Sequence, residues 1–356
     1  MRVEAKMIMM FEISSAFIQK YFYIIQAALG AYVGQPYLTA LSLLVALLLF
    51  VVPLIILVTI FIYMIGWVER KFMARMQSRH GPTYVGKFGF LQNLADLVKL
   101  LGKENIIPEK ADRVLFQTAI PAMVAAFIFM LVFLPLTQTY VGLDTSLGLI
   151  IVFLVLSFTP LFIFLAGWSS GNKFASIGAE RSVVMLISYE IPLLIVIISV
   201  AMLANSYNFQ AIIAAQHSVW FALVMPLGFI VFFIIMLAEF ERPPFDIREG
   251  DSELIAGWLT DVSAPYYGVV LFLDYARLFT GSLIISVLFL GGYLGPSILP
   301  PFAWTIIKVV LISLFVIIIR VTMVRMRIDR ILRLGWTYMM PLAVVNLLVT
   351  FVIFIH

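Results

Sequence analysis

The chain contains no cysteine among its 356 residues, and only 12% of its residues are charged. Iron–sulfur clusters and c-type haem are attached through cysteine, so this chain holds neither. It also lacks the glycine-rich loops that bind phosphates in P-loop and dinucleotide-binding proteins. Its three histidines, His80, His217 and His356, are too far apart in sequence to suggest a metal cluster. We expect any redox or ATP chemistry to depend on partner proteins.

Long apolar runs dominate what is present: 63% of the residues are hydrophobic, and the mean hydropathy is +1.10. Soluble domains carry about 25% charged residues, so this is an integral membrane protein. A span needs roughly 20 apolar residues, and lipid offers the backbone no hydrogen-bond partner, so spans of this kind are helical. The sequence therefore predicts an all-α polytopic membrane protein with eight transmembrane helices, at about 42–67, 115–136, 146–167, 183–204, 219–238, 265–290, 303–322 and 336–355.

Lysine and arginine alternate from one connection between these spans to the next. The odd-numbered connections carry eighteen of the 23 basic residues, nine of them from Glu69 to Arg113. The even-numbered connections, around Gln138, in 205–218 and in 291–301, carry none. Positive charge is retained in the cytoplasm, which predicts that the odd loops are cytoplasmic and that the C-terminus lies outside.

The first 38 residues stand apart from residues 39–356, which form the predicted membrane domain of eight transmembrane helices. Residues 7–34 are apolar but are interrupted by Glu12 and Lys20. This N-terminal extension is expected to be an amphipathic helix on the membrane surface, or else an extra span.

The first cytoplasmic loop contains a second amphipathic segment. Its leucines and valine recur at helical spacing, while polar residues share the opposite face, which predicts an amphipathic interfacial helix. The apolar set is Leu91, Leu94, Leu97, Val98 and Leu101, and the polar set is Gln92, Asp96, Lys99 and Lys103. The alternative is a routine basic loop; the length of the loop favours a structured platform. The third loop, GWSSGNKFASIGAERS, is either a plain turn or a polar rim around a cavity.

The fifth loop is acidic, with seven of the chain's nineteen carboxylates between Glu239 and Asp261. It begins at the end of the fifth span, which Pro243 and Pro244 terminate. A solvated acidic loop is the simpler interpretation. Against it, apolar residues such as Phe245, Ile247 and Trp258 are interleaved with the acids, so the loop can pack. Packed carboxylates raise one another's pKa and can hold protons near neutral pH.

Several charges fall inside the spans, where they are costly and tend to mark function. Glu190 precedes Pro192 in the fourth span, and Asp274 and Arg277 are spaced to pair on one helix face. With Lys308 they suggest a polar path through the bilayer. There are simpler alternatives. Glu190 can be a structural carboxyl whose hydrogen bonds are satisfied, and Glu69 and Lys308 can extend their charged ends to the membrane interface.

Four segments resemble the H subunit of NADH-quinone oxidoreductase (respiratory complex I), the NADH dehydrogenase subunit 1 family. They begin VERKFMARMQSRHGP, LAGWSSGNKFASIGAE, ERPPFDIREGDSELIAGW and RMRIDRILRLGW. They follow in the family's order from about Val68 to Thr350, so the resemblance covers nearly all of the chain beyond its N-terminal extension.

The resemblance implies eight spans and a subunit without a redox centre of its own, in a proton-translocating oxidoreductase. Quinone would be the substrate, bound at the interface with iron–sulfur and quinone-site subunits on the cytoplasmic side. Small membrane subunits leading to antiporter-like subunits would be the lateral partners, with membrane lipid around them. No flavin, iron–sulfur cluster, metal or nucleic acid is expected on this chain. The implied location is the plasma (inner) membrane of a prokaryote, as a multi-pass protein.

The motifs also imply site residues. A first set is expected to couple protons: Glu69, Glu190, Glu249, Asp251, Glu253, Asp261 and Asp274. A second set is expected to bind quinone: Arg70, Arg242, Phe245 and Asp246. The chain departs from the family's pattern where Arg248 replaces a proline and where Asp261 and Asp274 replace glutamates, so the shape of the acidic loop and the quinone type can differ from those of the family.

Two other functions compete with this interpretation. One is the homologous ion-coupling subunit of a membrane-bound hydrogenase or of a ferredoxin- or F420-linked complex, which need not use quinone. The other is a free-standing ion or solute transporter, disfavoured because the charged loops are rich in apolar residues suited to docking partners.

Overall fold

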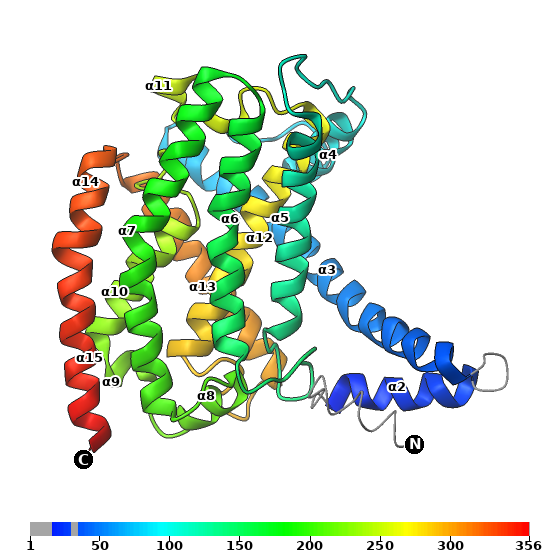
Figure 1. Cartoon of the computed structure of the whole chain (residues 1–356), viewed down its shortest axis with the longest axis vertical. Helices are drawn as coiled ribbons and strands as arrows, with labels where there is room; N and C mark the ends of the chain where they lie inside the picture. The colour runs from blue at the N-terminus through cyan, green and yellow to red at the C-terminus, as the bar shows by residue number, and fades with distance from the viewer. Residues whose placement is uncertain (1–15, 30–34, 356) are drawn as a thin grey trace.

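The apolar runs fold as helices throughout the part of the chain that the computed structural model describes, residues 16–29 and 35–355. Within those ranges seven helices are long and apolar enough to cross a membrane. They are α3 (Gln35–Met76), α5 (Arg113–Phe133), α6 (Gly148–Ser169), α7 (Lys173–Ala204), α12 (Ala264–Phe289), α13 (Pro301–Thr322) and a last helix that joins α14 (Ile328–Arg333), a π-helical turn η3 (Leu334–Met339) and α15 (Met340–Ile355). Figure 1 shows them as an upright bundle with α3 inclined to it.

The expected fifth span, 219–238, is interrupted. It consists of α9 (Phe221–Val224) and α10 (Pro226–Glu239), with Met225 between them at φ −131° and ψ 70°. Met225 leaves the helical conformation, and Pro226, which donates no backbone hydrogen bond, starts a new helix at its first position. By contrast, α3, α5, α6 and α7 each continue through an internal proline. At 14 residues α10 is about 21 Å long, shorter than the roughly 30 Å of a bilayer's hydrocarbon core. The described residues therefore contain seven of the eight expected spans as full-length helices, and a short apolar helix lies where the fifth was expected.

Helix α12 is the centre of the bundle. Its most apolar stretch is 72% buried, against 22% for α3 and for the last helix. It packs against α3, α5, α10 and α13. Arg277 on α12 is consequently buried and Asp274 is mostly covered, whereas α3 and α15 expose most of their apolar surface.

The odd-numbered connections meet at one end of the bundle. Asn105 in the first accepts from Ser263 in the fifth, and Asn172 in the third donates to Asp261 at 3.3 Å. The seventh joins through Met326 N, which donates to Pro244 O at 3.0 Å. The loops that carry the basic residues thus form one continuous surface, as their charge pattern predicts.

The even-numbered connections, which carry no lysine or arginine, meet at the other end. Asn208 in the fourth donates to Asp144 in the second, and Tyr293 in the sixth donates to Gln210 at 2.6 Å. Short helix α8 (Phe209–Ala215) lies here, at the bottom of Figure 1. The alternation of loops between two ends is confirmed, while their assignment to cytoplasm and exterior stays a prediction.

Two short helices lie outside the bundle. Helix α4 (Gln92–Leu101) packs on α3 and α12 through its polar side, where Asn93 donates to Tyr63 O at 3.1 Å, and leaves Leu94 and Val98 exposed. Helix α2 (Ala16–Leu29) packs on α3 near the even-loop end, where Phe17 contacts Phe50 and Tyr140. The rest of the expected segment 7–34, at residues 7–15 and 30–34, lies outside the described residues.

Because the chain has no cysteine, single introduced cysteines report its orientation. Ser297→Cys lies at the even-loop end and Lys87→Cys at the odd-loop end, and both side chains are exposed. We expect a membrane-impermeant maleimide to label Ser297→Cys in intact cells and to label Lys87→Cys only after permeabilisation. The reverse pattern would contradict the assignment of the basic end to the cytoplasm.

Candidate functional site

The acidic loop between α10 and α12 folds into the end of the bundle. Its apolar residues are almost completely buried: Phe245 is 2% exposed, Ile247 1% and Trp258 1%. Phe245 packs edge-to-face on Tyr189 of α7, with 5.6 Å between the two ring centres. The expectation that the loop packs is confirmed, and packing buries two of its charged residues, Arg242 and Arg248.

Glu69, at the odd-loop end of α3, is the most deeply buried carboxylate among the described residues, with 1% exposure. Arg242 of the acidic loop donates to it at 2.7 Å, and Arg320 at the end of α13 pairs with its other oxygen. Arg242 also lies 4.8 Å from the centre of the Tyr275 ring. One carboxylate therefore ties together α3, α13 and the acidic loop.

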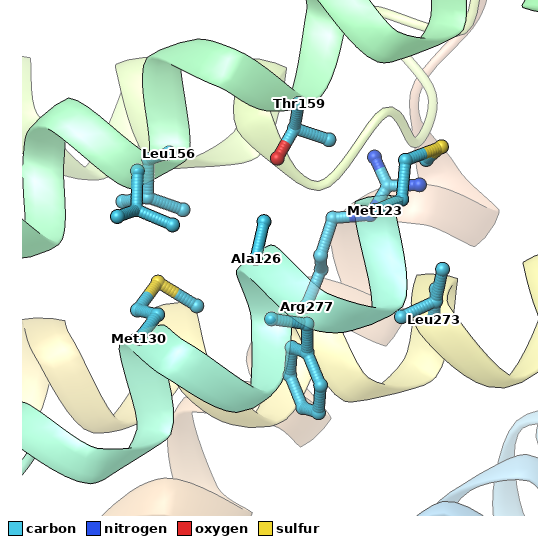
Figure 2. A pocket seen from close by; sticks show the side chains of 9 residues that line it. Met123, Ala126, Met130, Leu156, Thr159, Leu273 and Arg277 are labelled. Carbon is cyan, nitrogen blue, oxygen red and sulfur yellow. The ribbon is translucent and has the colours of Figure 1, made fainter. Parts of the chain in front are cut away.

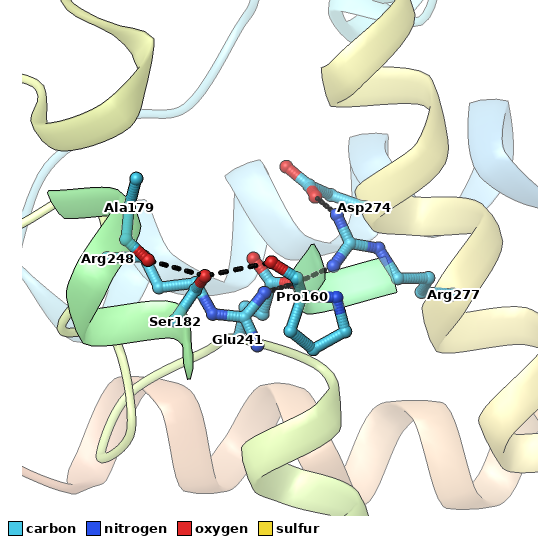
Figure 3. Close-up of polar contacts among 7 residues, drawn as sticks. All are labelled: Pro160, Ala179, Ser182, Glu241, Arg248, Asp274 and Arg277. Carbon is cyan, nitrogen blue, oxygen red and sulfur yellow. Dashed lines mark hydrogen bonds and ion pairs between the residues drawn. The ribbon is translucent and has the colours of Figure 1, made fainter. Parts of the chain in front are cut away.

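A second buried group lies beside the first. Glu241 pairs with Arg248 of the acidic loop and with Arg277 of α12, and Arg277 donates to Asp274 at 2.7 Å. Figure 3 shows this row, in which positive and negative side chains alternate from Arg248 to Asp274. The expected Asp274–Arg277 pair is confirmed. We call these four residues the charge row.

Glu190 and Glu239 extend the acidic groups along the bundle. Ser157 of α6 donates to Glu190 of α7. Glu239, in the last turn of α10, lies within electrostatic range of Glu190, Arg248 and Arg277. A line of charged groups thus runs from the acidic loop past α10 toward α7.

Charge balance in this cluster is uneven. Asp274 lies within electrostatic range of Asp246, Glu249, Arg242 and Arg248. Among the described side chains the cluster then contains seven carboxyls and four guanidiniums: Glu69, Glu190, Glu239, Glu241, Asp246, Glu249 and Asp274, with Arg242, Arg248, Arg277 and Arg320. Uncompensated charge is strongly disfavoured in a low-dielectric interior, and clustered carboxyls respond by keeping protons. Carboxyls grouped in this way are candidates for proton binding.

The outer acidic residues are more exposed. Glu253 is 51% exposed and pairs with Arg181 at 2.7 Å, and Arg325 lies 3.9 Å away. The hydrogen bond and charge of Arg181 lower the pKa of Glu253, which keeps it ionised at neutral pH. Asp261 accepts from Asn172. Asp251 begins α11 (Asp251–Leu254), and its side chain lies outside the described part of the structure.

The residues expected to bind quinone do not share one environment. Arg242 is buried on Glu69, and Phe245 is enclosed against Tyr189. Arg70 is 44% exposed and pairs with Asp96 of α4 at 2.7 Å, so it fixes the amphipathic helix to α3. Asp246 is partly buried in the acidic loop.

Lys308 lies apart from the charges with which it was expected to form a path. Its ammonium donates to the backbone carbonyls of Leu290, Gly292 and Leu294 at 2.6–2.8 Å and faces the Trp220 ring. These carbonyls follow the C-terminus of α12, about 13 residues or roughly 20 Å along the helix from Arg277. Lys308 satisfies a helix end at the even-loop side.

A narrow cleft reaches Arg277 from between α5, α6 and α12. Met123, Met130, Leu156 and Leu273 line its apolar part, and Thr159 lies across from Arg277 (Figure 2). Among the described residues, no three His, Asp or Glu side chains are grouped to hold a metal ion.

Comparison with known proteins decides the family. Residues 45–351 match the NADH dehydrogenase family. The chain belongs to this family. It is 40% identical to the H subunit of NADH-quinone oxidoreductase from Dehalococcoides mccartyi over 86% of each chain. It is 38% identical to the corresponding protein of a Geobacillus species over 79% of this chain and 86% of the relative. It is also 35% identical to the H subunit of F420H2 dehydrogenase from Methanosarcina acetivorans, over 83% of this chain and 91% of the relative.

Membership of the NADH dehydrogenase family did not single out every residue of the charge row. Sequence reasoning selected Asp274 and paired it with Arg277, but it placed neither Glu241 nor Arg248 among the site residues. One signal was available: within the acidic stretch from Asp246 to Asp261, Arg248 is the one basic residue. A single basic residue among several carboxylates is expected to pair with one of them when the segment is buried.

Lys308→Met tests whether this lysine is structural. Loss of the ammonium leaves three carbonyls short of a donor, at about 1–3 kcal/mol each before relaxation. We expect the melting temperature of the solubilised complex to fall by several degrees, with electron transfer unchanged in the protein that remains folded. Lys103→Met, at an exposed position, is the control. Unchanged stability combined with lost proton translocation would instead place Lys308 in the charge path.

Proposed function

We propose that this chain is the quinone-side membrane subunit of a proton-translocating quinone oxidoreductase. The observation that carries the proposal is the buried cluster at the odd-loop end, in which the acidic loop is tied to α3, α12 and α13 through Glu69, Glu241 and four arginines. The relatives that are H subunits of NADH-quinone oxidoreductases support the reaction class.

The chain itself would bind and deliver protons. Quinone takes up protons when it is reduced to quinol, and it would draw them through the carboxyls of the acidic loop, from Glu249 to Asp261. Passage of those protons would change the electric field at Asp274, Glu69 and Glu190. Because the cluster is poorly hydrated, such a change acts over a longer distance than it would in water. The signal would pass along the cluster toward neighbouring membrane subunits.

The arrangement in the membrane follows from this proposal. The seven long helices and α10 with α9 would make eight spans, with the basic end in the cytoplasm. Helix α4 would lie in the cytoplasmic interface with Leu94 and Val98 toward lipid, and α2 in the opposite interface. Residues 1–38 would be an interfacial extension of the membrane domain at 39–356.

Partner subunits would complete the site. Quinone would bind between the odd-loop surface and cytoplasmic subunits that hold the flavin and iron–sulfur clusters, near Arg70, Arg242, Phe245 and Asp246. Small membrane subunits would receive the charge signal and pass it to antiporter-like subunits. The chain would act in catalysis through its proton-coupling carboxyls.

A second electron donor is favoured by a specific observation. Two relatives from Methanosarcina species, 35% and 37% identical to this chain, are H subunits of F420H2 dehydrogenases. The chain would then have the same coupling role in an F420-linked complex. Donor choice would be made by the partner subunits.

Electron transfer in native membranes separates these alternatives. We expect NADH or reduced F420 to reduce added quinone in a reaction that a quinone-site inhibitor abolishes. Glu190→Gln and Glu253→Gln should slow coupled turnover by about tenfold to a hundredfold, since a positioned proton carrier contributes at least that much. Donor oxidation with hydrogen evolution and no quinone requirement would move the chain to a hydrogenase, and wild-type turnover and pumping in both variants would remove the proposal.

A further inference from the structure

Arg248 is placed more tightly than a loop residue normally is. Gly257, at φ 53°, folds the loop back so closely that a Cβ there would come within 1.8 Å of the Arg248 carbonyl oxygen. On the other side, a Cβ at Gly178 of α7 would lie 2.9 Å from the same oxygen and 2.6 Å from Trp258 N. The Arg248 carbonyl is therefore enclosed between two glycines. This close packing fixes the position of the backbone from which the side chain extends.

The side chain of Arg248 enters the bundle. It is 3% exposed and ends at the carboxylate of Glu241 (Figure 3). Burial lowers the pKa of Arg248 to about 10, which still leaves the guanidinium charged at neutral pH. A charge that cannot be discharged must be neutralised by a neighbour that stays ionised.

Glu241 is held to meet it. This residue lies two positions beyond the end of α10, in the left-handed region at φ 55°, and its amide donates to Ala238 O at 3.0 Å. That conformation is uncommon for a residue other than glycine. The conformation directs the carboxylate between Arg248 and Arg277.

With all four members ionised, the charge row Arg248–Glu241–Arg277–Asp274 has no net charge. Without Arg248 the row would carry one uncompensated negative charge. That charge would be removed by binding a proton.

We propose that Arg248 is a positioning residue that sets how many protons the buried cluster holds, by keeping Glu241 ionised and anchored to α12. This deepens the proposed function, because it identifies the residue that tunes the proton-coupling site. It does not require Arg248 to touch quinone or to transfer a proton.

The test is an infrared titration of protonated carboxyl groups in the purified complex, which needs no quinone and no turnover. Arg248→Met should add protonated-carboxyl absorbance at neutral pH and shift its titration upward by about 1 pH unit or more. Arg248→Lys keeps the charge and should remain close to wild type. The added absorbance should vanish in Arg248→Met/Glu241→Gln. Arg333→Gln, at an exposed arginine on α14, is the matched control.

An assembled Arg248→Met complex with a wild-type titration would overturn the proposal. If that variant does not assemble, the double variant Arg248→Met/Glu241→Gln tests the pairing instead. Recovery of assembly supports the proposal, because the double variant removes both charges of the pair. Continued failure to assemble overturns it. Should the titration shift while membranes show no inhibitor-sensitive quinone reduction, the proposed function fails and the role of Arg248 in the cluster stands.

Discussion

Neutralisation of buried carboxylates by arginine is the interaction on which the odd-loop end of this protein depends. Glu69 and Glu241 each receive two guanidiniums, and each lies at a point where separate elements meet. Removing one partner from a buried ion pair typically costs about 3–5 kcal/mol. The acidic loop therefore holds its position through charge as well as through the burial of Phe245 and Trp258.

The same interaction gives the site its chemistry. A cluster in which carboxyls outnumber guanidiniums can neither ionise completely nor be wholly protonated without losing ion pairs. Under the proposed function, its proton content responds to charge nearby. The acidic loop and the charged groups inside the bundle interact electrostatically. Asp274 on α12 lies within electrostatic range of Asp246 and Glu249 in the loop.

Periodicity and charge placement predicted most of the fold. Seven of the eight expected spans are long helices, and the absence of basic residues from alternate loops predicted which loops meet. The interruption at Met225 and Pro226 was missed because hydropathy does not register a lost backbone donor. The charge row was only half predicted: Asp274 and Arg277 are three residues apart on one helix, whereas Glu241 and Arg248 meet through a folded loop. Lys308 was grouped with these charges, whereas its ammonium donates to backbone carbonyls. Composition cannot distinguish a buried cation that pairs with acids from one that donates to the backbone.

The most direct test of the account compares proton translocation with electron transfer in proteoliposomes containing the purified complex. Asp274→Asn removes the carboxylate at the α12 end of the charge row and keeps its shape. The account predicts that quinone reduction continues while the number of protons translocated per electron falls sharply. Undiminished translocation in this variant would contradict the claim that the buried cluster couples the acidic loop to the membrane.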